Sequence, residues 1–125
     1  RTPPPTPDAR LRLADYAYGL APPRLTPGWR LIEITSAGPA EHVAEVARLR
    51  PGRRLADVLA PPPADAAAED PEEAVVGGST RLAPGGRTFV WLHLTPGRYV
   101  VQCPLRTPSR QSHLRRGMIA ELEVR

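Results

Sequence analysis

The sequence predicts an all-β protein, and three observations lead to this prediction. A chain of 125 residues is long enough for one domain with a single core. Its 17 prolines and ten glycines lie between short apolar runs, which indicates many turns and short strands. Several of these runs alternate apolar and polar residues, as half-buried strands do. We therefore expect a Greek-key β-sandwich of about seven strands, with one short helix and a long acidic loop.

The first nine residues differ from the rest of the chain in composition. The sequence begins RTPPPTPD, and proline-rich segments form semi-rigid spacers. We expect residues 1–9 to be a tether or tail and residues 10–125 to be the domain. An ordinary frayed terminus explains the first residues equally well. Because the sequence starts at Arg1 without methionine, we interpret it as a trimmed or mature chain of an exported protein, on the periplasmic or extracellular face of a membrane.

Three strands are expected in the first part of the domain. The segment RLRLADYAY (10–18) begins with strict alternation that places Leu11 and Leu13 on one face. The segment GWRLIEITSAG (28–38) predicts the second strand. The segment HVAEVARLR (42–50) predicts the third.

A short helix and an acidic loop should follow these strands. In RRLADVLA (53–60) the apolar residues recur at helical spacing. The next segment, 61–74, begins with three prolines and cannot bury much apolar surface, so we expect an exposed loop. Five of the 13 acidic residues lie in it: Asp65, Glu69, Asp70, Glu72 and Glu73. Such a charge run is usually a solvated surface without a specific function.

The last three expected strands surround one cysteine. They are RTFVWLHL (87–94), RYVVQC (98–103) and the alternating segment 118–124. Cys103 is in phase with core-facing residues of its strand, and Met118 begins on the inside face of the last one. His93 lies in phase with neighbouring aromatic residues, and we interpret it as a structural histidine.

The charge distribution limits the classes of partner. All 17 basic residues are arginine, and only eight acidic residues lie outside the acidic loop. The body of the domain is therefore basic and should favour acidic partners. We expect no nucleic-acid partner, because no binding motif or aromatic platform accompanies the arginines. We also expect no enzyme, because the sequence shows no carboxylate pair, no nucleophile with a base at a recognisable spacing and no phosphate-binding glycine loop.

Cys103, His113 and Met118 follow one another around the last two strands. Thiolate, imidazole and thioether are the soft and borderline ligands of a mononuclear blue-copper site. Such a site needs a second histidine, and His42 is the candidate. A lone cysteine, methionine or histidine is more often an ordinary core residue, so only the joint occurrence of the four predicts a metal site.

The stretch PGRYVVQCPLRTPSRQSHLRRGMIAELEV (96–124) resembles the final hairpin and ligand loop of the cupredoxin family. The upstream stretch ITSAGPAEH (34–42) is similar to the strand, glycine and first histidine ligand of that family. The interval between Cys103 and His113 is longer than in plastocyanins and is closer to that of the type 1 site in copper nitrite reductases.

This resemblance implies a cupredoxin-like domain with one type 1 copper. His42, Cys103 and His113 would be the equatorial ligands, and Met118 the axial ligand. Gln102 stands where nitrite reductases have a histidine for their second copper, so nitrite reduction is not expected. Ser36 and Val43 stand where many relatives have asparagine.

The resemblance implies a single-electron carrier that docks through the face around His113, which the loop should bring to the surface. Four arginines flank this histidine: Arg106, Arg110, Arg115 and Arg116. The expected partner is an acidic redox protein or a membrane-bound redox complex. This chain has no apolar run that could span a membrane, and a membrane tether is expected N-terminal to it. One alternative is a metal-free cupredoxin-like binding module or accessory subunit of a membrane complex, and a weaker one is a copper chaperone or store.

Overall fold

The computed structural model describes residues 3, 5–60, 70–105, 113 and 117–125. Among these residues there are nine strands and one helix. The strands are β1 (Ala9–Ala14), β2 (Ala17–Ala21), β3 (Arg24–Leu25), β4 (Gly28–Ser36), β5 (Glu45–Leu49), β6 (Glu72–Gly78), β7 (Arg87–Leu94), β8 (Gly97–Gln102) and β9 (Ile119–Val124), and the helix is α1 (Leu55–Leu59).

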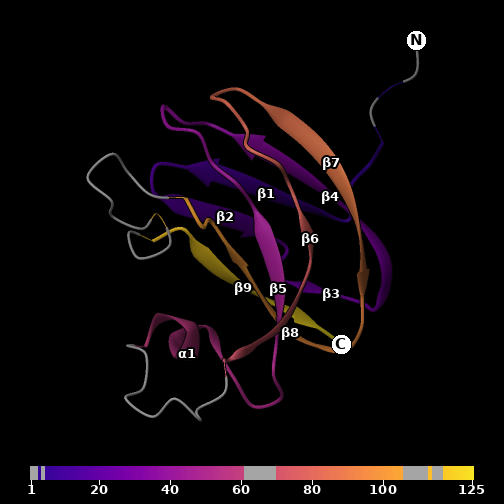
Figure 1. The fold of residues 1–125 in the computed structure, drawn as a ribbon. Coiled ribbons are helices and arrows are strands. Elements are labelled where there is room, and N and C mark those ends of the chain that lie inside the picture. The colour runs from indigo at the N-terminus through magenta and orange to yellow at the C-terminus, as the bar shows by residue number, and fades with distance from the viewer. Residues whose placement is uncertain (1–2, 4, 61–69, 106–112, 114–116) are drawn as a thin grey trace.

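The strands form two sheets that pack face to face (Figure 1). One sheet has the order β2-β1-β4-β7, and the other has the order β3-β9-β8-β5-β6. Consecutive strands often lie in different sheets, so the chain crosses between the layers as a Greek-key sandwich requires. The predicted all-β sandwich is confirmed. The described part of the chain has more strands than expected. The additional strands are β2, whose residues are exposed or half-buried, β3, which has two residues, and β6.

The main core lies between the two sheets. Leu11 and Leu13 of β1 and Ile34 of β4 enter it from one sheet, as the alternation predicts. Tyr99 and Val101 of β8 enter it from the other. The strands therefore bury one face of each sheet against the other, which is the main source of stability for such a fold.

A second, smaller cluster covers the outer face of the five-stranded sheet. Leu55 and Val58 of α1 pack there against Leu49 and Val100. The predicted short helix is thus present, and it explains why both faces of β8 are buried. No helix of the described residues is long and apolar enough to cross a membrane.

The acidic segment is described only at its end. Residues 61–69 lie outside the described residues. Strand β6 begins at Glu72, inside the range that was expected to be a loop, and it pairs antiparallel with β5. Asp8, near the end of the expected tail, is bound to β4. Its backbone N–H donates to the Leu31 carbonyl oxygen at 2.8 Å, and its Oδ2 accepts from Leu31 N–H at 2.7 Å.

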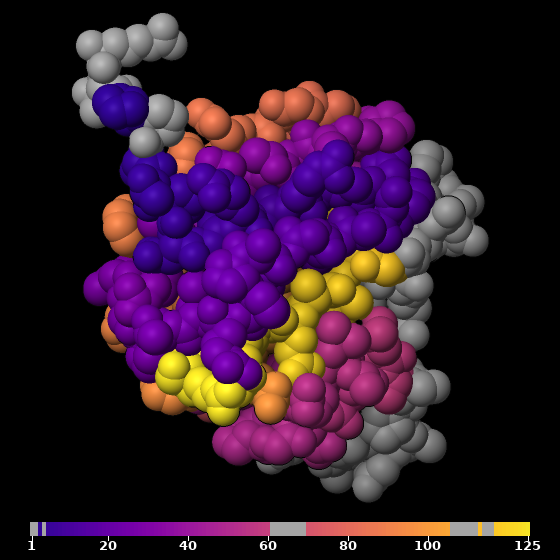
Figure 2. Space-filling model, turned by 180° about the vertical axis from the view of Figure 1, so that it is seen from behind, coloured from indigo at the N-terminus to yellow at the C-terminus, as the bar shows by residue number. Residues whose placement is uncertain are grey.

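The topology brings several connections to one end of the sandwich, at the left of Figure 1. Strands β1 and β4 are parallel neighbours, so the segments that follow them emerge side by side. Strand β8 ends at the same end of its sheet where β5 and β9 begin, because β8 is antiparallel to both. Seen from behind, the indigo and purple N-terminal strands lie against the yellow C-terminal strand (Figure 2).

Candidate metal centre

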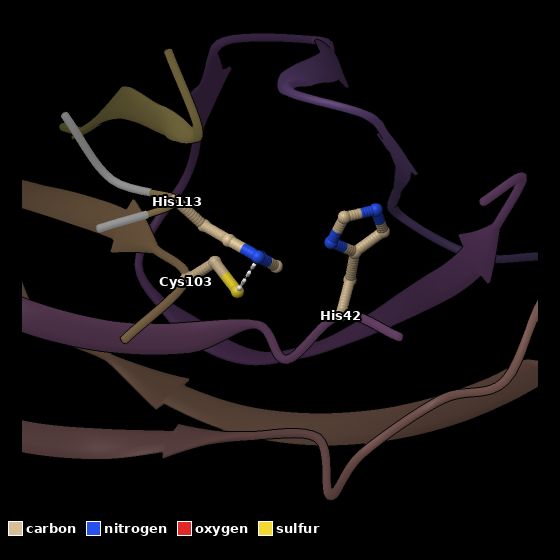
Figure 3. Close-up of side chains that lie close together, drawn as sticks. All are labelled: His42, Cys103 and His113. Atoms are coloured by element: carbon tan, nitrogen blue, oxygen red, sulfur yellow. Dashed lines mark hydrogen bonds between the residues drawn. The ribbon is translucent and has the colours of Figure 1, made fainter. Parts of the chain in front are cut away.

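Three buried side chains meet at this end of the sandwich. His42, Cys103 and His113 each offer a ligand atom, and these atoms lie within 4.8 Å of one another. The Cys103 Sγ is 3.5 Å from the His113 Nδ1, and the two imidazole centroids are 5.3 Å apart. Figure 3 shows the three side chains pointing toward one another. Their exposed fractions are 0%, 0% and 4%, so the donor atoms are shielded from water.

The backbone at Met118 joins two members of this cluster. Cys103 N–H donates to the Met118 carbonyl oxygen at 3.2 Å, and Met118 N–H donates to the His113 carbonyl oxygen at 3.1 Å. The Met118 side chain is fully buried. The structure thus brings the region of the fourth expected ligand to the other three, while ligation by its sulfur stays a prediction.

The glycine before Met118 is required by a close approach of the chain. Gly117 has a φ of +120°, and a Cβ there would lie 2.6 Å from the Tyr16 carbonyl oxygen. A larger residue would clash with the turn between β1 and β2. The glycine that precedes Met118 in the sequence is therefore explained by sterics.

His42 is held at its backbone and at one ring nitrogen. Its N–H donates to the Leu82 carbonyl oxygen at 3.1 Å, and its own carbonyl oxygen accepts from Leu82 N–H at 2.8 Å. The ring Nε2 lies 2.6 Å from Asp15 Oδ1. The ring Nδ1 is buried without a hydrogen-bond partner, one of two such side-chain atoms in the described part of the chain. Burying a nitrogen without a hydrogen-bond partner destabilises the folded state, unless a bound group such as a metal ion uses its lone pair.

The Cys103 sulfur accepts a hydrogen bond from the segment that carries His42. Val43 N–H donates to Cys103 Sγ at 3.5 Å. The Val43 carbonyl oxygen accepts from the Tyr18 hydroxyl at 2.7 Å. Burial raises the pKa of Tyr18 far above its usual range, with a further contribution from Cys103, so this hydroxyl stays protonated as a donor. Backbone and tyrosine contacts thus connect the two ligand segments without the asparagine that many relatives have.

Three residues around the cluster have no signal in the sequence pattern of the expected ligands: Asp15, Tyr16 and Tyr18. All belong to the β1–β2 hairpin. The Tyr16 ring makes edge contacts with both imidazoles, at centroid distances of 4.9 Å to His113 and 6.3 Å to His42. The sequence predicts one strand over 10–18, whereas Asp15 and Tyr16 lie in the turn between β1 and β2. No periodicity or spacing relates the segment DYAY (15–18) to the cysteine.

The histidine at the expected exit is more buried than predicted. His113 is 4% exposed, so its ring does not reach the surface, contrary to the expectation from the sequence. The expected docking residues flank His113 in sequence and lie outside the described residues, namely Arg106, Arg110, Arg115 and Arg116. Docking through them therefore stays a prediction.

Gln102 and His93 lie apart from the three clustered side chains. Gln102 points away from the cluster, and its amide donates to Glu72 at 2.6 Å and to Glu45 at 3.3 Å. His93 is exposed on β7 and packs against Trp29 at a centroid distance of 5.1 Å. Neither residue belongs to the cluster of His42, Cys103 and His113.

The donor set fits a type 1 copper site. Two imidazoles and one thiol converge in a buried space, and an unpaired Nδ1 is among the atoms that face it. Two histidines and one cysteine, with a weak axial methionine, are the ligands of blue-copper sites. The buried sulfur and nitrogen atoms are poor ligands for magnesium and calcium, which prefer oxygen.

Comparison with solved structures agrees with the fold. The chain is similar to a dithionite-reduced auracyanin from Roseiflexus castenholzii, with a TM-score of 0.60 and 20% identity over 93% of this chain and 94% of that one. It is also similar to auracyanin A of Chloroflexus aurantiacus, described as a "blue" copper protein, with a TM-score of 0.53 and 16% identity over 93% and 96% of the two chains. A purple cupredoxin from Nitrosopumilus maritimus matches with a TM-score of 0.50 and 14% identity over 94% and 100%.

Sequence comparison alone is less informative. No protein-family model matches the chain, and no curated protein has a significantly similar sequence. The likeness in structure nevertheless extends over nearly the whole length of the chain and of these three proteins. The chain therefore has the cupredoxin fold.

Proposed function

We propose that this protein is an exported electron carrier with one type 1 copper, bound by His42, Cys103, His113 and Met118. The observation that carries the proposal is the buried cluster of two imidazoles and one thiol with a free Nδ1 on His42. The neighbours described as a blue copper protein and a purple cupredoxin have the same fold, which supports the proposal further.

The chain's own residues would keep the site rigid. When bound, copper would supply a one-electron couple between its cupric and cuprous states. The ligand segments are tied to one another by the Val43–Cys103 and Cys103–Met118 hydrogen bonds. A site whose ligands cannot move far changes its geometry little when its charge changes, which favours rapid electron transfer. The burial of all four proposed ligands would also exclude water from the metal.

The proposal includes docking to an acidic partner. Arg106, Arg110, Arg115 and Arg116 flank His113 in sequence and would make the face above it basic. A basic face speeds association with an acidic protein or an acidic membrane-bound redox complex, and this gain falls as salt screens the charges. A proline-rich segment before the domain fits a tether to a membrane.

The test is copper loading of the purified protein. Wild-type protein should bind one Cu(II) per chain and show an intense visible absorption from thiolate-to-copper charge transfer. Cys103→Ser removes the thiolate with little change in volume and should abolish this band. His93→Ala is the matched control, because His93 is exposed and lies outside the cluster.

Three outcomes would contradict the proposal. A colourless wild-type protein without bound copper would favour a metal-free binding module. Copper that transfers to a chelator without a stable redox couple would favour a chaperone or store. A band that survives in Cys103→Ser would show that the metal binds elsewhere.

A further inference from the structure

A carboxylate is in direct contact with one proposed copper ligand. Asp15 Oδ1 lies 2.6 Å from His42 Nε2. The same carboxylate accepts from Ala40 N–H, at 3.2 Å to Oδ1 and 3.4 Å to Oδ2. The Asp15 side chain is 21% exposed, whereas the His42 side chain is completely buried. The hydrogen bond from Ala40 fixes the carboxylate beside the ring and ties the β1–β2 turn to the segment that carries the ligand.

This contact determines which nitrogen of His42 carries the proton. A carboxylate only accepts hydrogen bonds, so Nε2 must be the protonated nitrogen that donates to Asp15. The neutral ring then has its lone pair on Nδ1, which is the buried atom without a partner. An outer carboxylate of this kind orients a histidine ligand and increases its basicity.

The charge of Asp15 also affects the balance between the two copper oxidation states. With one thiolate, two neutral imidazoles and one carboxylate nearby, the Cu(II) form has no net charge and the Cu(I) form has one negative charge. Low-dielectric surroundings raise the free energy of the charged Cu(I) form relative to the neutral Cu(II) form. The carboxylate should therefore stabilise Cu(II) more than Cu(I).

We propose that Asp15 is a positioning residue that holds His42 in its Nε2-protonated form and lowers the reduction potential of the site. This inference rests on the proposed function, because it assumes that copper binds at His42, Cys103 and His113. It adds a residue that the sequence pattern of the ligands does not contain, contributed by the turn that follows β1.

The test combines two variants with a charge-matched control. Asp15→Asn keeps an oxygen acceptor for Nε2–H but removes the negative charge. Asp15→Ala removes both the charge and the acceptor. Glu33→Gln removes one negative charge from β4, where Glu33 makes a 3.7 Å ion pair with the exposed Arg10.

The first measurement is made on metal-free protein. Nitrogen NMR of the imidazoles should show His42 as the Nε2-protonated tautomer in wild type, Asp15→Asn and Glu33→Gln. In Asp15→Ala a mixture of tautomers should appear. Wild-type-like tautomer populations in Asp15→Ala would overturn the positioning role.

The second measurement is made on copper-loaded protein. Mutation of an outer group that is hydrogen-bonded to a metal ligand commonly weakens metal binding by about 10–100-fold. We expect a Cu(II) affinity loss of this order in Asp15→Asn and a smaller loss for Cu(I). Each factor of ten in the ratio of the two affinities raises the potential by about 59 mV. Glu33→Gln should leave the potential unchanged.

The outcomes separate this inference from the proposed function. A wild-type potential in both Asp15 variants would overturn the redox part of the inference, while copper binding itself would stand. An equal increase in Glu33→Gln would show a general charge effect and would also overturn it. If wild-type protein binds no copper, the proposed function and the redox part both fail, and the NMR experiment still decides the tautomer.

Discussion

Met118 shows how one residue can serve both the fold and the proposed site. Its side chain is completely buried, and its backbone bonds to Cys103 and His113. A methionine in this position is also an ordinary core residue, so burial alone does not distinguish the two roles. The distinction requires a substitution that keeps the volume and removes the sulfur.

Met118→Leu is such a substitution. We expect it to lower the free energy of unfolding of the metal-free protein by less than about 1.5 kcal/mol, because the volume is nearly conserved. In copper-loaded protein the potential should rise, since a weak thioether donor to Cu(II) is lost. Denaturant titration and redox potentiometry measure the two effects. Leu122→Met, in β9, is the control, and a Met118→Leu potential equal to that of wild type would contradict axial ligation.

At the scale of elements, Glu121 in β9 connects α1 and β8. Its carboxylate accepts from Arg54 Nε at 2.8 Å, from Leu55 N–H at 2.9 Å and from Arg98 at 2.9 Å. Burial raises the pKa of Glu121, but these hydrogen bonds outweigh burial, and the pKa lies below its usual value. The ionised carboxylate therefore stabilises the folded state.

Glu121→Gln should lower the free energy of unfolding at neutral pH. Because the folded-state pKa of Glu121 is lowered, its contribution is complete above the unfolded pKa, about 4.3, and is lost as pH falls through the folded value. The difference between wild type and variant should thus shrink below about pH 4. Denaturant titrations at several pH values measure it.

Glu123→Gln is the control for this prediction. Glu123, two residues further along β9, makes longer ion pairs, at 3.5 Å to Arg24 and 3.2 Å to Arg125. Such surface pairs contribute little, so this variant should change stability by less than about 1 kcal/mol. A stability difference for Glu121→Gln that does not vary with pH would show that its charge is not the cause.

At the scale of the whole molecule, the proposed site connects distant parts of the chain. His42 precedes β5, Cys103 follows β8, and His113 lies in the connection to β9. A metal held by all three would bind only the folded chain, since the unfolded chain does not keep these ligands together. Binding should therefore stabilise the whole sandwich.

Copper removal tests this coupling. At a free copper concentration about 1,000 times the dissociation constant, the expected gain is about 4 kcal/mol. For a domain of this size that corresponds to an increase in Tm of roughly 10–20 °C. Scanning calorimetry before and after treatment with a chelator measures it. Cys103→Ser should show a much smaller increase, and an unchanged wild-type Tm would contradict a site that spans these segments.

The sequence by itself determined the class of fold and the type of chemistry. Alternation places Leu11 and Leu13 in the core because a strand has a period of two residues, which is a local property. The order of Cys103, His113 and Met118 around two strands indicated soft-metal ligands, because donor chemistry depends on residue type. His42 was identified through its resemblance to a known ligand segment, and the structure places it with Cys103 and His113.

Only the tertiary structure decided which residues surround these ligands. Asp15 lies 27 positions before His42, and the parallel pairing of β1 with β4 brings the two together. Tyr16, in the same turn, contacts the imidazoles of both His42 and His113. The burial of His113 likewise depends on packing that no local pattern reports. The periodicity of a strand depends only on neighbouring residues. Contacts between turns depend on the order of the strands in the sheets, and that order is a property of the whole chain.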